Sequence, residues 1–355
     1  MAKIGNFCWM AAVLMLAGCG SGGDTASTSG GSSAGGSSTG STGKKLKVGI
    51  VFDRGGKGDK SFNDSADAGI QRAVKEFGIE EKDLQSNTEK DYEPNLTALA
   101  EAGCDPIFAV GFAQKEALSK VAPKFPDIHF ALIDDVLDQK NVRSLVFAEE
   151  QGSFLAGYLA ALTSKTGKIG FVGGMSIPLI KKFETGYIAG AKTANPAIDA
   201  TGIKYTENWD DTGAGKAAAT VLFTGGCDIV YHAAGKCGLG VISAAKDQGK
   251  FAIGVDSDQD GQEKGSVLTS MVKHVDEAVY QTIKDVRDNK FTAGTKVFDL
   301  KSKGVGLTDF QYTKDKIGDA TIKKLADVTQ QIIDGKIVVP AKPEDLAPFL
   351  AKSKK

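Results

Sequence analysis

Excess charge of one sign is missing from this chain of 355 residues, which has 43 Lys and Arg residues against 44 Asp and Glu residues. A protein dedicated to nucleic acid normally has a basic excess or a basic stripe, so the balance argues against that class. The hydrophobic fraction of 41% and the charged fraction of 25% are those of ordinary globular proteins. They exclude a chain that is disordered throughout and a protein with many membrane spans.

Histidine and cysteine are also scarce, with 3 and 5 residues. No Cys or His cluster has the spacing of a zinc site, and the common hydrolase and metalloprotease motifs are missing, so we expect no metal, no cofactor and no catalytic residues. Cys8 and Cys19 lie near the start of the chain, which leaves Cys104, Cys227 and Cys237 for the folded part. A disulfide between Cys227 and Cys237 and buried free thiols are both open.

The one apolar run near the N-terminus, residues 7–17, is too short to span a bilayer and is typical of a signal peptide. It leads into Leu16-Ala17-Gly18-Cys19, which resembles the lipobox of bacterial lipoproteins. We therefore predict a signal peptide over 1–18, lipid on Cys19, and a location on the extracytoplasmic side of the cell membrane; an ordinary signal peptide is the alternative. The Gly/Ser-rich segment within 19–43 is predicted to be a flexible tether.

From Lys44 onward, short β-rich runs alternate with amphipathic helical stretches, a pattern that predicts an α/β fold with parallel sheets covered by helices. The pattern runs through two similar cycles, and the remaining residues are too few for a third domain. We expect one lobe from 44–150 plus about 257–300, and a second lobe from 151–256 plus about 301–355. Ligands of parallel sheets bind beyond the carboxyl ends of the strands, which places the site between the lobes.

Three acidic residues follow predicted strands directly: Asp53, Asp134 and Asp256. Because they lie at strand ends they can converge, and ionised carboxylates accept strong hydrogen bonds from sugar hydroxyls. The glycine-rich loop that begins at Asp53 lacks the Gly-Lys-Ser/Thr ending of a phosphate-binding P-loop. It carries Phe62, whose ring could stack on a flat ligand or pack on the core at the helix entry.

Several segments carry a resemblance to one family. Residues 49–64 (GIVFDRGGKGDKSFND), 253–259 (IGVDSDQ) and 268–275 (LTSMVKHV) resemble the basic-membrane-protein family, the purine-nucleoside-receptor type of substrate-binding lipoprotein in ABC importers. The resemblance extends over about 44–340. It implies the type I periplasmic-binding-protein fold, with two Rossmann-like lobes joined by three crossings that act as a hinge.

The resemblance also implies a set of residues around a bound nucleoside. Phe62 and Trp209 would hold the base between their rings, and Asp134 and Ser61 would contact its edge. The other members would contact the ribose. The full implied set is Asp53, Ser61, Phe62, Asp134, Trp209, Gly235, Asp256 and Lys273.

The function that these features predict is capture of nucleosides, purine nucleosides above all, by closure of the hinge. The implied partners are the permease and ATPase subunits of an ABC importer, and we expect a lipid-anchored monomer with no nucleic-acid partner. A sugar receptor and a ligand-sensing lipoprotein without transport are the alternatives. A nucleoside hydrolase is less favoured, because the chain has no recognisable aspartate-rich metal loop.

Overall fold

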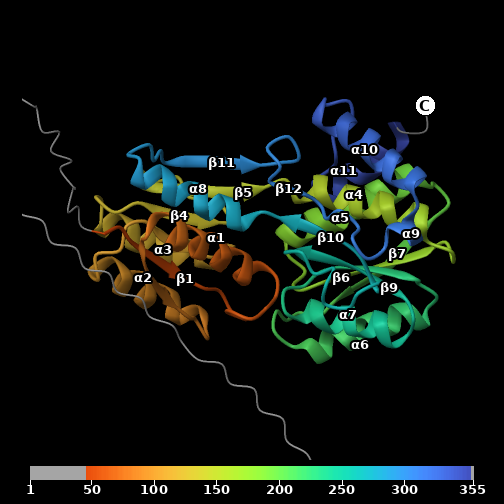
Figure 1. The fold of residues 1–355 in the computed structure, drawn as a ribbon, viewed down its shortest axis with the longest axis horizontal. Helices are drawn as coiled ribbons and strands as arrows, with labels where there is room; N and C mark the ends of the chain where they lie inside the picture. Colours follow the sequence, from red (N-terminus) through yellow and green to blue (C-terminus); the bar gives the residue numbers. More distant parts are fainter. Residues whose placement is uncertain (1–44, 353–355) are drawn as a thin grey trace, which may run out of the picture. The chain divides into compact units, whose positions relative to one another are not determined.

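The computed structural model describes residues 45–352, which lie within one compact unit beginning at Lys44. The predicted signal peptide, Cys19 and the whole of the predicted tether lie outside the described residues. Two six-stranded sheets organise the described part, each with helices on both faces (Figure 1). The prediction of two α/β lobes is therefore confirmed.

The first lobe is built on a sheet whose strand order is β11-β5-β4-β3-β1-β2, with every neighbouring pair parallel. Its strands are β1 (Lys47–Val51), β2 (Glu80–Leu84), β3 (Ile107–Ala109), β4 (Phe130–Ile133), β5 (Val142–Phe147) and β11 (Gly294–Phe298). Its helices are α1 (Phe62–Phe77), α2 (Tyr92–Glu101), α3 (Lys115–Val121) and α8 (Val275–Arg287). Helices α1 and α8 pack together, as do α2 and α3.

The second lobe repeats this plan with the order β12-β10-β9-β8-β6-β7, in which only the short β12 is antiparallel to its neighbour. Its strands are β6 (Lys168–Gly173), β7 (Asp199–Tyr205), β8 (Ile229–Ala233), β9 (Phe251–Asp256), β10 (Val267–Lys273) and β12 (Val305–Leu307). Its helices are α4 (Glu149–Thr163), α5 (Pro178–Ala194), α6 (Thr212–Thr224), α7 (Cys237–Asp247), α9 (Lys314–Ile317), α10 (Asp319–Ile333) and α11 (Pro343–Lys352).

One boundary of the sequence-based division is wrong. Residues 257–300 were expected in the first lobe, but β10 pairs with β9 in the second sheet. The chain therefore returns to the first lobe at His274, after β10 and before α8. The reason is that β10 completes the parallel sheet of the second lobe, and such long-range pairing is not visible in the local pattern.

The chain passes between the lobes three times, at Ala148, at His274 and over residues 299–304. These crossings are hydrogen-bonded to the strands and segments beside them. Ala148 N–H donates to Phe298 at 2.9 Å, and His274 N–H donates to Gly304 at 2.9 Å. Three short adjacent connections are the arrangement that lets two lobes turn about a hinge.

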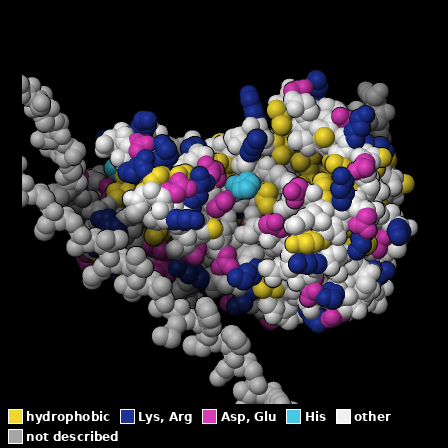
Figure 2. Space-filling model, viewed as in Figure 1, with side chains coloured by type: hydrophobic (Ala, Val, Ile, Leu, Met, Phe, Trp, Pro, Cys, Tyr) yellow, Lys and Arg dark blue, Asp and Glu magenta, His cyan; other side chains and the backbone are white. Residues whose placement is uncertain are grey.

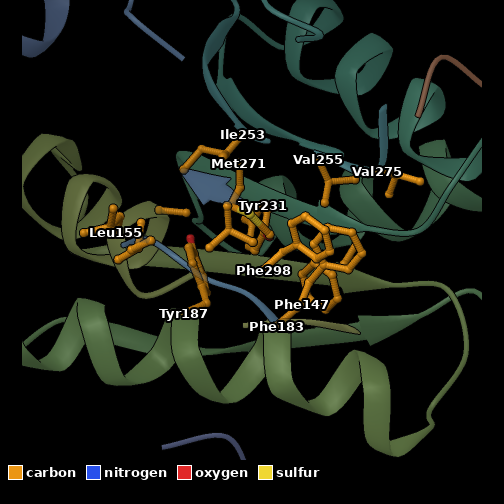
Figure 3. Packing of buried hydrophobic residues seen from close by; sticks show 14 of the residues in the cluster. Phe147, Leu155, Phe183, Tyr187, Tyr231, Ile253, Val255, Met271, Val275 and Phe298 are labelled. Atoms are coloured by element: carbon orange, nitrogen blue, oxygen red, sulfur yellow. The ribbon is translucent and has the colours of Figure 1, made fainter. Parts of the chain in front are cut away.

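The largest buried cluster runs through both lobes. It joins the α1/α8 face of the first sheet to the α4/α5 face of the second, and aromatic side chains meet where the two faces approach. Figure 3 shows Phe147, Phe183 and Phe298 close together in this part of the cluster. Smaller clusters fill the opposite faces, under α2/α3 and under α6/α7.

Candidate functional site

A cavity lies between the lobes. Seven of the eight residues predicted to bind a ligand line it: Asp53, Phe62, Asp134, Trp209, Gly235, Asp256 and Lys273. The first three come from the first lobe and the last four from the second. Phe62 and Trp209, expected to face one base, therefore stand on opposite lobes of the same cavity.

Two of the acids adopt a backbone conformation that is rare for residues other than glycine. Asp134 directly follows β4 with φ of 73°, and Asp256 ends β9 with φ of 64°. The left-handed region costs an L-residue roughly 1–2 kcal/mol. Strain of this kind gathers at functional sites, where it aims a side chain, and here both acids reach the cavity.

Asp53 is held so that one carboxylate oxygen stays free. The Tyr92 hydroxyl donates to Oδ1, and so does the Arg54 backbone N–H at 2.7 Å. Oδ2 accepts no hydrogen bond among the described residues and lies against Gly111, where a Cβ atom would stand 2.4 Å from it. Burial raises the pKa of Asp53, and the bonds from Tyr92 and Arg54 oppose that rise.

A buried ion pair joins the two lobes inside the cavity. Lys273 Nζ donates to Asp134 Oδ2 at 2.6 Å, and the two side chains are only 3% and 5% exposed. A second carboxylate, Glu149, lies 3.8 Å from the same ammonium. Burial alone lowers the pKa of Lys273, but these carboxylates and Asp256 raise it above its usual value, so the lysine stays charged.

The other oxygen of Asp134 has no partner. Oδ1 is buried and accepts no hydrogen bond from any described residue. A buried acceptor without a donor costs about 1–3 kcal/mol. Because Asp134 lines the cavity, a ligand N–H or O–H group is the donor that this geometry can accommodate.

Aromatic rings surround the Lys273 ammonium. Its nitrogen lies 4.8 Å from the ring centre of Phe62, 5.2 Å from Phe147 and 5.7 Å from Phe183. Such contacts stabilise a desolvated cation by up to about 2 kcal/mol. Phe183, on α5, lines the cavity and was not predicted from the sequence.

Asp256 and Ser61 form one unit across the lobes. The Ser61 hydroxyl donates to Asp256 Oδ2 at 2.5 Å, and Ser61 is fully buried and does not line the cavity. The expected contact of Ser61 with a ligand stays a prediction, and in this structure its hydroxyl supports Asp256. Burial raises the pKa of Asp256 to about 6, although Lys273 and Ser61 act in the opposite direction.

Glycines make room for Trp209. A Cβ atom at Gly174 would lie 2.2 Å from the indole ring, and one at Gly235 would lie 3.2 Å from the Trp209 carbonyl oxygen. Gly235 also has φ of 54°, which favours glycine. The indole ring therefore packs against the backbone at Gly174, and Trp209 also lines the cavity.

Other residues of the cavity were not anticipated. Leu179, Ile180 and Phe183 line it from the start of α5, the helix that follows the first strand of the second lobe. Phe62 occupies the equivalent place in the first lobe, at the start of α1 after β1. That internal correspondence between the two cycles is the signal that could have found them.

The three cysteines of the described part, Cys104, Cys227 and Cys237, are buried free thiols, so Cys227 and Cys237 form no disulfide. Residues 45–352 hold no group of three or more His, Cys, Asp or Glu side chains arranged for a metal ion. Within the same range, every helix is too short or too polar to cross a membrane.

Two lobes of parallel sheet, three hinge crossings and a cavity lined from both sides define a solute-binding protein of the type I periplasmic class. Residues 46–343 match the family model described as "ABC transporter substrate-binding protein PnrA-like". The chain belongs to this Bmp family of ABC transporter substrate-binding proteins. The predicted family is thereby confirmed, and so is a binding protein rather than an enzyme.

Relatives and solved structures agree with this assignment. The chain is 37% identical to the ABC transporter nucleoside-binding protein BmpA of Lactococcus lactis, over 94% of this chain and 97% of that one. It is 35% identical to basic membrane protein A of Borreliella burgdorferi, over 88% and 93%. A solute-binding protein of an ABC transporter system from Aeropyrum pernix has a TM-score of 0.78 at 29% identity, covering 87% of this chain and 97% of that one.

Proposed function

We propose that this protein captures nucleosides, purine nucleosides above all, outside the cytoplasmic membrane and delivers them to the permease and ATPase of an ABC importer. The observation that carries the proposal is the composition of the cavity, with aromatic rings from both lobes and carboxylates at the strand ends. A nucleoside offers a flat ring to the aromatics and hydroxyl donors to the carboxylates. The name of the Lactococcus lactis relative as a nucleoside-binding protein supports the same ligand class.

In this proposal each part of the cavity has a role. Phe62 and Trp209 stack on the two faces of the base, which contributes about 1–3 kcal/mol per base in other nucleic-acid systems. The unpartnered Oδ1 of Asp134 accepts from the base edge. Asp53 and Asp256 accept from the ribose hydroxyls, and ionised acceptors make the stronger hydrogen bonds.

Closure of the lobes follows from where the contacts lie. The ligand touches residues of both lobes, so it binds the closed arrangement better than the open one and shifts the equilibrium toward it. Lys273 contributes by holding Asp134 in place, through the ion pair at 2.6 Å. The importer would distinguish the closed form from the open form.

The membrane attachment belongs to the same proposal. A lipid on Cys19 and the Gly/Ser-rich segment after it would tether the receptor, as a monomer, on the extracytoplasmic face of the membrane. Acylation adds about 0.8 kcal/mol per buried methylene group, so several chains give a stable anchor. Mass spectrometry of the protein from membranes, before and after Cys19→Ala, tests this step.

Calorimetric titration tests the ligand class. The chain from Lys44 onward, which is a compact unit, is titrated with inosine, guanosine, adenosine and ribose. We expect binding of the purine nucleosides and no comparable binding of ribose. Tight ribose binding without nucleoside binding would instead identify a sugar receptor.

A further inference from the structure

A loop of the second lobe is hydrogen-bonded directly to a loop of the first lobe beside the cavity. The hydroxyl of Ser257, just after β9, donates to the carbonyl oxygen of Ser61 at 2.9 Å. The amide Nε2 of Gln259 donates to the carbonyl oxygen of Lys60, also at 2.9 Å. Lys60 and Ser61 lie between β1 and α1. We call these two bonds the interlobe lock.

The amide of Gln259 is oriented by its own lobe. Its Oε1 accepts from the Val255 N–H at 2.9 Å and faces His232 Nε2 at 3.0 Å, so the donating nitrogen is turned toward Lys60. Burial lowers the pKa of His232 to about 4, so the ring is neutral. Its proton lies on Nε2, because the amide oxygen that Nε2 faces can only accept. The His232 ring leaves room only for glycine at position 238, since a Cβ atom at Gly238 would stand 2.0 Å from the ring.

We infer that Ser257 and Gln259 are positioning residues, which set the balance between open and closed lobes and so the affinity for the ligand. Neither side chain lines the cavity. Both ends of the lock are nevertheless close in sequence to residues that line the cavity. Ser257 directly follows Asp256, and Ser61, whose carbonyl oxygen the lock holds, directly precedes Phe62. Forming the lock therefore brings the Asp256 carboxylate of the second lobe and the Phe62 ring of the first lobe to the cavity together.

The size of the effect follows from the hydrogen bonds. A typical intramolecular hydrogen bond changes an equilibrium by roughly two- to twelve-fold. When both open and closed arrangements are populated without ligand, weakening the closed state lowers its population and weakens affinity by up to the same factor. We expect the loss in the dissociation rate, because the bonds form after the ligand has entered.

Two variants and one control separate the lock from general packing. Ser257→Ala and Gln259→Met each remove one interlobe bond. Asp258→Asn changes an exposed residue of the same loop. Among residues 45–352, the only hydrogen bond of Asp258 lies within the loop, where its Oδ1 accepts from the Asp260 N–H at 2.9 Å. Gln259→Met also loses its bonds to Val255 and His232, so Ser257→Ala keeps the test valid where Gln259→Met folds poorly.

The measurements are the lobe distance without ligand and the inosine dissociation rate. Spin labels on cysteines at Lys82 and Val221, one exposed position in each lobe, report the distance. The inference predicts a more open distribution and a two- to twelve-fold faster dissociation for Ser257→Ala, a shift in the same direction for Gln259→Met, and neither change for Asp258→Asn. Distances and rates equal to wild type in both lock variants would overturn it.

The inference rests on the proposed function only for the inosine rate. If no nucleoside binds, the proposed function fails, while the distance distributions without ligand still test the lock. A purely structural role of the loop would lower the melting temperature of the lock variants and leave the distances unchanged, which would also overturn the inference.

Discussion

Replacing Lys273 with methionine is expected to destabilise the protein strongly. Lys273 is buried with three carboxylates nearby, and its nitrogen lies 2.6 Å from Asp134 and 3.8 Å from Glu149. Methionine keeps much of the volume but removes the charge. Deleting one partner of a buried ion pair costs about 3–5 kcal/mol, because the other partner stays buried without compensation.

The loss should depend on pH, and the sign follows from the carboxyl groups. Lys273 lowers the pKa values of Asp256 and Glu149, which burial raises, so its removal raises both further. A group with a raised pKa binds protons in the folded chain that the unfolded chain has already released, so its contribution to stability falls as pH rises. The pKa of Asp256 is already about 6 in the wild type, so the pH range over which the variant loses stability begins near pH 4 and extends above pH 6.

Urea unfolding of wild type and Lys273→Met at pH 5 and pH 8 measures this. We expect a free-energy loss of about 3–5 kcal/mol at pH 8 and a smaller loss at pH 5. Lys236→Met is the matched control, because Lys236 lines the same cavity but forms no ion pair within residues 45–352; its effect should stay within about 0.5 kcal/mol. A loss below 1 kcal/mol, or one equal at both pH values, would refute the reasoning.

Three further predictions concern the ligand. Gly111→Ala should weaken inosine binding, because the added Cβ atom would displace the Asp53 carboxylate. Gly103→Ala is the control: it is also at positive φ but has open space at its Cβ, so it should lower stability alone. Calorimetry measures the binding, and melting curves measure the stability. Trp209→Ala should weaken binding about 5- to 150-fold through lost stacking, and unchanged affinity would remove the indole from the site. Affinity should fall between pH 7.5 and pH 5, because Asp256, with a pKa of about 6, accepts stronger hydrogen bonds from hydroxyls when it is ionised. Titrations at the two pH values would show a flat profile if Asp256 makes no such contact.

The fold could be predicted wherever local pattern and position agree. Strands that are buried on both faces gave continuous apolar runs, and β1 and β9 stand out for that reason. Strand β2 reads Glu-Glu-Lys-Asp-Leu, is mostly exposed and lies at a sheet edge, so neither alternation nor an apolar run reveals it. Strand β10 has an apolar pattern, but its lobe depends on long-range pairing with β9.

The candidate site was predictable where strand ends supply it. Asp53, Asp134 and Asp256 follow strands, and parallel strands end at one edge, so their convergence follows from order alone. Phe183 escaped prediction because the face of α5 that meets the cavity depends on packing, and Glu149 escaped it because its approach to Lys273 depends on how α4 packs. The hydrogen bond from the buried Ser61 hydroxyl to Asp256 also escaped prediction, because it joins residues of different lobes that are far apart in the sequence.

A crystal structure of the protein with inosine tests the central claim most directly. The account predicts closed lobes, the base between Phe62 and Trp209, a base N–H donating to Asp134 Oδ1, and ribose hydroxyls within hydrogen-bond distance of Asp53 or Asp256. Inosine bound outside this cavity, or inside it with neither ring against the base, would contradict the account.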